Sequence, residues 1–244
     1  TVQTNAAAWQ YGVLQENYKR WKGKNEARLL IWYQNARRNI PPPMTAAAST
    51  AWQHDQSVRA LTGWKYAHKR LVMDAKTAYM LETLHYSDEQ TGINSESKTQ
   101  TWQTDMETRV QFSPRFLLSM GVNHGFQTAT ADNLPKNIYR NQTSVVAMLK
   151  TASKTGKANA SASIKQSFVD KNLVPMTAAV GGEIVIAPVM SIAANITKNY
   201  RLPTFNDLYW QPGGNPNLKP ESGWSQEFTA ATQWNVRKWA VKTE

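Results

Sequence analysis

The segment 199–221, NYRLPTFNDLYWQPGGNPNLKPE, gathers the side chains best suited to chemistry. Its Tyr and Trp rings offer stacking surfaces, and its amides and carboxylate offer hydrogen-bonding groups, which together suit a large polar ligand. Asn-Pro and Gly-Gly pairs are also strong turn formers, so the same residues can serve instead to order a loop. The candidate ligand-binding or loop-ordering residues are Asn206, Asp207, Tyr209, Trp210, Asn215 and Asn217.

Catalytic chemistry is not indicated anywhere in the sequence. There is neither a G-x-S-x-G nucleophile elbow nor a Gly-rich phosphate-binding loop. The chain has no cysteine, and its histidines lack the spacing of metal ligands. We therefore expect no enzyme activity, no catalytic residue, no metal site and no cofactor. The histidines are His54, His68, His85 and His124.

Composition narrows the class of partner. A net charge of +11 and a pI near 9.8 suit a polyanionic ligand. The basic residues are nevertheless spread along the chain, with no run of five, so we do not expect nucleic acid as a partner. The 10 Trp and 9 Tyr, in a chain with a mean hydropathy of −0.55, indicate a stacking surface or a membrane interface. No apolar run is long enough for a transmembrane helix.

Apolar and polar residues alternate with a period of two along nearly the whole chain, which is typical of β-strands. Tight and long connections also alternate, which predicts an antiparallel up-and-down meander with its long loops on one side. The expected long loops are 45–56, 87–98, 131–141 and 203–221. About twelve strands are expected, at 7–21, 26–40, 58–66, 71–86, 101–112, 116–128, 144–153, 158–169, 176–186, 191–202, 224–234 and after a turn at 236–238.

Three features favour an all-β transmembrane barrel over a soluble sandwich or a lipocalin-like barrel. The strands exceed the usual length of about 5–6 residues, and the polar faces carry ionisable side chains, as a wet lumen allows. Aromatic pairs ten residues apart on one face would span about 25 Å, the height of the apolar band of a membrane barrel. The predicted lipid-facing girdle residues are Trp102, Phe112, Trp224 and Trp234. The predicted lumen- or plug-facing residues are Arg201, Asp105, Glu107 and Arg109.

The segments RLPTFNDLY at 201–209 and GNPNLKPE at 214–221 resemble the paired boxes of TonB-dependent outer-membrane receptors, closest to cobalamin and siderophore receptors. WYQN at 32–35 and RNIP at 38–41 extend the resemblance over most of the chain, whereas Leu202 replaces the family's usual Ala. The family implies a barrel of about 22 strands closed by an N-terminal plug. Such receptors import large scarce nutrients, using energy from an inner-membrane complex. Haem receptors of this type carry a His between the two boxes, and 205–214 contains none, which disfavours haem.

On this resemblance, residues 1–244 are expected to form one partial β-barrel domain, truncated at both ends, with about 12 of 22 strands and no plug. The implied function is uptake of cobalamin or a ferric siderophore across the outer membrane of a Gram-negative bacterium. The implied partners are outer-membrane lipid, the nutrient, and the TonB complex through an N-terminal segment that lies outside this sequence. A surface lipoprotein is a further candidate partner. The alternative function is a soluble or surface β-sheet module that binds a polyanion such as nucleic acid or polysaccharide.

Overall fold

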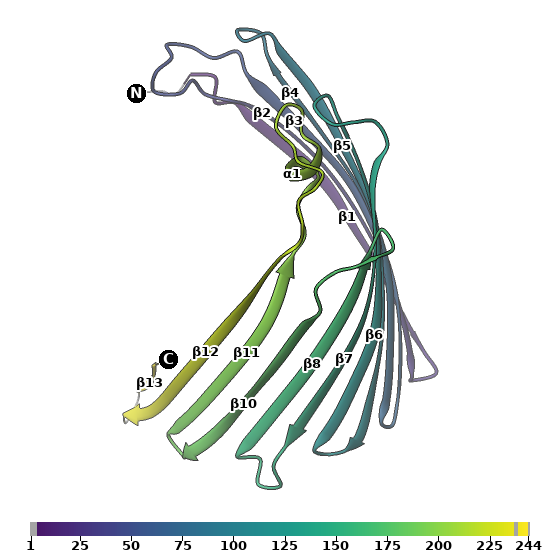
Figure 1. Ribbon diagram of the computed structural model, residues 1–244, viewed down its shortest axis with the longest axis vertical. Helices are drawn as coiled ribbons and strands as arrows, with labels where there is room; N and C mark the ends of the chain where they lie inside the picture. The colour runs from purple at the N-terminus through teal and green to yellow at the C-terminus, as the bar shows by residue number, and fades with distance from the viewer. Residues whose placement is uncertain (1–3, 237–238, 244) are drawn as a thin grey trace.

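The strands of the computed structural model, which describes residues 4–236 and 239–243, form one strongly curved antiparallel sheet (Figure 1). Each strand pairs with its neighbours in sequence, in the order β1-β2-β3-β4-β5-β6-β7-β8-β10-β11-β12-β13, and β9 pairs with β8 alone. The first strands are β1 (Ala8–Trp21), β2 (Asn25–Asn39), β3 (Trp52–His68), β4 (Leu71–Asp88), β5 (Ile93–Ser113) and β6 (Phe116–Ala131). They are followed by β7 (Ile138–Ala152), β8 (Ala158–Val169), β9 (Asn172–Leu173), β10 (Thr177–Ala187), β11 (Met190–Arg201), β12 (Glu221–Val236) and β13 (Trp239–Thr243). The predicted all-β antiparallel meander is therefore confirmed.

The short turns and the two longest loops lie at opposite ends of the strands, as the sequence predicts, although the expected long loop 87–98 is shortened to 89–92. The turns that are described in full, 22–24, 69–70, 114–115, 153–157 and 188–189, lie along the lower edge of Figure 1. The longest loops, 40–51 and 202–220, leave the opposite end, and the second of them contains the helix α1 (Phe205–Tyr209). We call these the turn end and the loop end of the sheet. Part of the expected turn at 236–238 lies outside the described residues.

Several strands run further toward the loop end than the sequence predicts. β5 begins at Ile93, inside the expected loop 87–98, and pairs with β4 as far as Asp88. Likewise β3 begins inside the expected loop 45–56 and β7 inside the expected loop 131–141. Residues 93–98, INSESK, are mostly polar on both faces, so they carry little alternation even though their backbone continues the ladder. The two-residue strand β9 and the helix α1 are also additions to the predicted elements.

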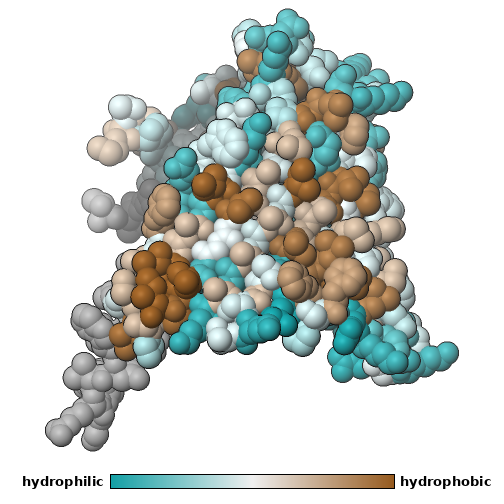
Figure 2. Space-filling model, turned by 60° about the horizontal axis from the view of Figure 1, so that its bottom comes forward, coloured by the Kyte–Doolittle hydropathy of each residue, from teal (hydrophilic) through white to brown (hydrophobic). Residues whose placement is uncertain are grey.

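The sheet has an apolar face and a polar face. Cross-strand partners carry the apolar set from strand to strand, as when Met106 lies opposite Ala75 on one side and Val122 on the other. Many of these side chains are exposed, and Figure 2 shows brown apolar patches over the middle of one surface, with teal hydrophilic side chains toward its rims. The cavities that the curvature creates are lined mainly by the polar set, which places that set on the concave face. Exposed apolar members of the convex face include Trp102, Met106, Phe112, Met120, Val122, Phe126, Val180 and Phe228.

A conventional hydrophobic core is missing from the described part of the chain. Its buried hydrophobic residues are Ala51, Ala129, Ile138 and Val174. The most deeply buried side chains are instead Ser144 and Ser167, whose hydroxyl oxygens are 2.8 Å apart across β7 and β8. Large apolar surfaces that face outward mark a protein or membrane contact in natural proteins. No helix among the described residues is long and apolar enough to cross a membrane.

Candidate functional site

The loop 202–220 is built around α1, a helix of 5 residues. Thr204 caps its N-terminus: the Thr204 hydroxyl accepts a hydrogen bond from the Asp207 N–H at 3.1 Å, and the Thr204 N–H donates to Asp207 Oδ2 at 2.8 Å. This reciprocal capping box satisfies two N–H groups that a helix start leaves without partners. A Thr followed three residues later by Asp is its sequence signature, so the helix start could have been found from the sequence.

Asp207 also forms an ion pair with Arg201, the last residue of β11. Arg201 Nη2 lies 3.6 Å from Asp207 Oδ2, with both side chains substantially exposed. The Thr204 N–H, the Thr204 side chain and, to a smaller extent, Arg201 hold the pKa of Asp207 below its ordinary value. Arg201, predicted to point into the lumen, is thus engaged by the loop that directly follows it.

The depressed pKa of Asp207 predicts that acid loosens the loop. A carboxylate with a lowered folded-state pKa contributes stability above its unfolded pKa of about 3.9, and that stability is lost as pH falls through the folded value. Hydrogen exchange, corrected for intrinsic rates, should therefore show falling protection at the Thr204 and Asp207 amides below about pH 4. In an Asp207→Asn variant this pH dependence should vanish. An equal loss of protection in the variant and the parent would contradict the assignment.

The chain reverses direction directly after α1. The Gly214 N–H donates to the Trp210 carbonyl at 2.6 Å, and the Trp210 N–H donates to the Asn206 carbonyl at 3.1 Å. A Cβ on Gly214 would lie 2.5 Å from the Trp210 backbone nitrogen, so a side chain there would collide with main-chain atoms. Beyond the reversal, Asn215 Oδ1 accepts from the Asn217 N–H, and the Asn215 N–H donates to the Asp207 carbonyl. Four of the candidate residues, Asn206, Asp207, Asn215 and Asn217, therefore make contacts within the loop itself.

The other two candidates present rings at the same place. Phe205 and Tyr209 face each other across one helical turn with ring centroids 6.4 Å apart, and Trp210 keeps 40% of its surface exposed. These rings are held on a scaffold of backbone hydrogen bonds, which limits the conformational entropy that a stacked ligand would have to overcome. Direct contact between these six residues and a nutrient stays a prediction.

Contacts with β7 and its preceding loop tie the 202–220 loop across the concavity. Arg140 Nη2 donates to the Pro203 carbonyl at 2.6 Å, and its guanidinium lies 5.0 Å from the centroid of the Phe205 ring. The Gln211 N–H also donates to the Asn133 carbonyl at 2.9 Å. β7 and β11 are separated in the sheet by β8 and β10, so the loop spans the ends of these two intervening strands. Arg140 was not among the predicted residues, because nothing local in the sequence links positions 63 apart.

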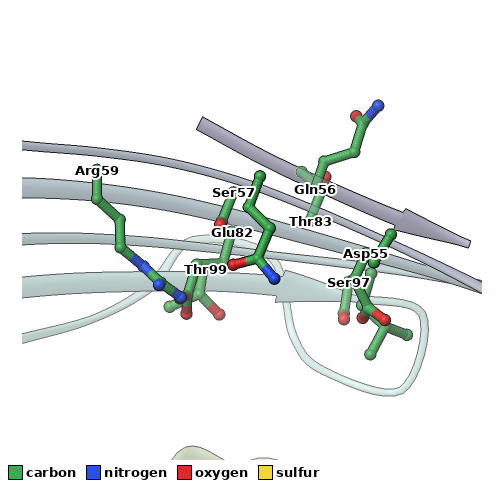
Figure 3. Close-up of a pocket in the computed structure, with 11 residues that line it drawn as sticks. Asp55, Gln56, Ser57, Arg59, Glu82, Thr83, Ser97 and Thr99 are labelled. Atoms are coloured by element: carbon green, nitrogen blue, oxygen red, sulfur yellow. The ribbon is translucent and has the colours of Figure 1, made fainter. Parts of the chain in front are cut away.

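A cavity of about 480 Å³ lies on the concave face near the loop end of β2 to β5. Figure 3 shows Arg59 and Glu82 directed to one side of the sheet, while Gln56 points away from them. Arg59 Nη2 lies 2.6 Å from Glu82 Oε1, and its guanidinium lies 4.7 Å from the centroid of the Trp32 ring. Because Arg59 and Glu82 pair with each other, the groups of this cavity that can contact a molecule in the lumen are mainly hydroxyls and amides. They belong to Gln34, Ser57, Ser97 and Thr99.

The other predicted lumen residues lie in a second concave region, toward the turn end. Asp105 and Glu107 line a cavity of about 320 Å³, where Asp105 accepts a hydrogen bond from Asn123 and Glu107 pairs with Arg109 at 3.3 Å. Ser119, on the same cavity wall, is buried, and its hydroxyl makes no hydrogen bond to any described residue. Asp105, Glu107 and Arg109 therefore share the concave face but are separate from the loop 202–220, which we call the rim loop.

The predicted girdle residues that are described lie on the apolar face and are exposed. Trp102 and Phe112 expose 50% and 58% of their surfaces, and Trp224 exposes 68%. Lys198 Nζ lies 5.8 Å from the centroid of the Trp224 ring, so its stem can follow the apolar surface while its charge stays near the strand end. The side chain of Trp234 lies outside the described residues.

The histidines of the described chain form no metal-binding cluster with other side chains, and three of them have an amide or hydroxyl neighbour. His54 lies 3.0 Å from Asn35 Oδ1, and His85 lies 2.6 Å from Asn94 Oδ1, both near the loop end. His124 Nδ1 lies 3.0 Å from the Thr143 hydroxyl. Each of these contacts satisfies one ring nitrogen. His54 and His85 are cross-strand partners in β3 and β4, but among the described residues they belong to no group of three or more side chains that could hold a metal ion.

Comparison with known proteins gives a family match over residues 3–243, described as TonB dependent receptor-like, beta-barrel. The Vitamin B12 transporter BtuB of Photobacterium profundum is 38% identical over 56 residues, which are 23% of this chain and 9% of that protein. The Vitamin B12 transporter BtuB of Vibrio vulnificus is 36% identical over 91 residues, which are 31% of this chain and 15% of that protein.

Solved structures share the fold at low sequence identity. The Serratia marcescens hemophore receptor HasR, in complex with its hemophore HasA and heme, aligns with a TM-score of 0.73 at 11% identity, over 92% of this chain and 42% of that one. The FrpB iron transporter from Neisseria meningitidis (F3-3 variant) aligns at 0.70 and 10%, over 98% and 44%. The ferric citrate transporter FecA aligns at 0.68 and 12%, over 94% and 42%. The chain thus spans less than half the length of these solved proteins.

Proposed function

We propose, because the chain belongs to the TonB-dependent receptor β-barrel family, that it forms part of the wall of an outer-membrane transporter for a large scarce nutrient. The family match over residues 3–243 carries the proposal, since it covers nearly the whole chain. The family consists of transporters and receptors rather than enzymes. The site of action is the outer membrane of a Gram-negative bacterium, with the convex face against lipid and the concave face toward the lumen.

The two faces of the sheet support this orientation. Exposed apolar side chains on the convex face match a lipid-facing wall, whereas ion pairs and hydroxyls on the concave face match a wet or plugged lumen. β1 and β13 are the edges of the sheet among the described residues, and open edges do not persist in hydrocarbon. In this proposal the remaining wall and the plug come from other parts of a full-length receptor. That receptor draws energy from the TonB complex, and its loop end faces outward.

Cobalamin is the nutrient we place first, with a ferric siderophore second. The support is local: two relatives named as vitamin B12 transporters share 38% and 36% identity with segments of this chain. The likeness to a heme-bound hemophore receptor, at 11% identity, concerns the fold alone. The stretch 205–214 offers rings, amides and a carboxylate but no imidazole to ligate haem iron.

Uptake by the full-length receptor that contains this chain tests the proposal. In a Gram-negative strain lacking its own cobalamin receptor, expression should restore saturable uptake of labelled cyanocobalamin, which should stop when the proton gradient is dissipated. Binding of a ferric siderophore without cobalamin would reassign the nutrient. Failure to bind or import either class, with the receptor present in the outer membrane, would overturn the transport function.

Two tryptophans beside the same loop provide a matched pair for the binding site. Trp210 lies in the rim loop, whereas Trp224 is exposed on the convex face of β12. Trp210→Ala should raise the Kd for the nutrient at least about tenfold, as expected for an aromatic anchor. Trp224→Ala should leave the Kd unchanged. Equal effects of the two substitutions would remove the rim loop from the binding site.

A further inference from the structure

The connections at the two ends of the sheet differ in charge, and the turn end is strongly basic. The four consecutive turns 22–24, 69–70, 114–115 and 153–157 contain no Asp or Glu but are rich in Lys and Arg. The loops at the opposite end are nearly balanced, with acids at 89, 132, 170 and 207 and lysines at 136, 171 and 219. The cationic turn residues are Lys22, Lys24, Lys69, Arg70, Arg115, Lys154 and Lys157.

These seven cations are exposed and free of ion pairs within the part of the chain that the structure describes. Every one of them has an exposed side chain, and the ion pairs formed by described residues involve other Lys and Arg residues. The Arg70 side chain donates a hydrogen bond from Nη1 to the Phe112 carbonyl at 3.1 Å. Like charges on adjacent hairpins repel one another, so their clustering without acids calls for an anionic partner.

Backbone geometry indicates that lysine is not there to make the turns. Lys22 and Lys69 have φ values of 52° and 51°, in the left-handed region where glycine and asparagine are favoured. Gly23 lies between Lys22 and Lys24 and has a φ of 61°. A turn optimised for backbone conformation alone would place Gly or Asn at both lysine positions.

The convex side of one of these turns, 114–115, carries aromatic side chains. Phe112 and Phe116 flank the turn that holds Arg115, and they expose 58% and 46% of their surfaces. Aromatic rings of a membrane barrel gather at the level of the lipid headgroups. Arg115 lies in the turn between them, which places it at the depth of the headgroup phosphates, where a cation is attracted to an anionic lipid surface.

We propose that these seven residues form a basic collar that binds the phosphates of anionic phospholipids in the leaflet at the turn end. The inference rests on the proposed function, which sets the convex face in a membrane. It accounts for the charge that otherwise suggests a polyanion-binding module, and it commits to phospholipid headgroups as the anion. The turn 188–189, which has no cation, marks where the collar ends among the turns described in full.

Lipid selectivity of the full-length receptor tests the collar. The receptor is reconstituted into vesicles of equimolar phosphatidylglycerol and phosphatidylcholine, with one or the other lipid brominated, and quenching of tryptophan fluorescence gives the relative affinity. The parent should prefer phosphatidylglycerol, and Lys24→Gln/Arg115→Gln/Lys157→Gln should reduce that preference at least about fivefold, the factor for one cation near a membrane surface. The control Lys136→Gln/Lys171→Gln/Lys219→Gln removes three charges from the loop end and should leave the preference intact.

Three results would overturn the collar. The first is equal quenching of the parent by the two lipids, and the second is an equal loss of lipid preference in the collar variant and the control variant. The third is a collar variant that keeps its lipid preference but loses binding to peptidoglycan sacculi. Nutrient binding measured on the same preparations reports separately on the proposed function. A receptor that binds nutrient but shows no lipid preference refutes the collar alone, whereas one that prefers anionic lipid but binds no nutrient refutes the nutrient assignment.

Discussion

Replacing Gly214 by alanine in the full-length receptor should weaken nutrient binding by about 10- to 100-fold. The new Cβ would lie 2.5 Å from the Trp210 nitrogen and 2.8 Å from the Trp210 carbonyl oxygen, and both atoms belong to main chain that cannot rotate away. The reversal must open, which costs on the order of 1–3 kcal/mol of strain, or move the Trp210 ring out of position. Titration of the nutrient against purified receptor measures the effect.

Gly223 supplies the matched control for this substitution. It lies in β12 just past the same loop, and a Cβ built on it meets nothing within 4 Å. Gly223→Ala should therefore leave affinity unchanged. Amide exchange across 203–215 should rise in Gly214→Ala and stay at the parent level in Gly223→Ala. If Gly214→Ala binds the nutrient as tightly as the parent although amide exchange across 203–215 has risen, the rim loop does not contact the nutrient.

An arginine in place of Phe228 should destabilise the membrane-inserted receptor by about 2–4 kcal/mol, the cost of a charge near the middle of the lipid face of a barrel. Phe228 exposes 74% of its surface on the convex face and lies near the middle of β12. Denaturant unfolding in bilayers, followed by the gel mobility of folded and unfolded barrel, measures the difference.

The neighbouring position distinguishes a lipid effect from a strand effect. Thr229 follows Phe228 in β12 and points to the opposite, concave face, where it lines a cavity with Glu227. Thr229→Arg should cost far less than Phe228→Arg, because its guanidinium would enter the polar lumen. Equal destabilisation by the two substitutions would mean that the convex face does not contact lipid.

Strand number, pairing order and the alternation of turns and loops are predictable from sequence, because each depends on a repeating local pattern. In β5, Trp102, Met106 and Phe112 are separated by even numbers of residues and therefore lie on one face, and this local pattern is enough to identify the strand. The dependence on a local pattern also explains why the starts of β3 and β5 were predicted too late in the chain. Where β5 and β3 leave the apolar band, neither face needs to be apolar, so the pattern ends while backbone pairing continues.

The contacts of the rim loop also divide into local ones, which the sequence predicts, and long-range ones, which it does not. Thr204 and Asp207 are only three positions apart, so their capping box can be identified from a short segment of the sequence. The hydrogen bond from Arg140 to Pro203 joins β7 to a loop 63 positions later, and it depends on where the intervening strands β8 and β10 place β11 relative to β7. That placement is a property of the assembled sheet, and no local pattern in the chain reports it.

The nearest-neighbour order of the sheet also sets a direction for folding. Every long strand pairs with the strands before and after it, so each pairing closes a short loop and costs little chain entropy. Hairpins can therefore add one after another, each presenting a template edge for the next strand. The Arg140 contact with Pro203 can form only after β8, β10 and β11 have joined. Closure of the rim is thus a late event, and kinetic traps should collect at the stage when that loop is still free.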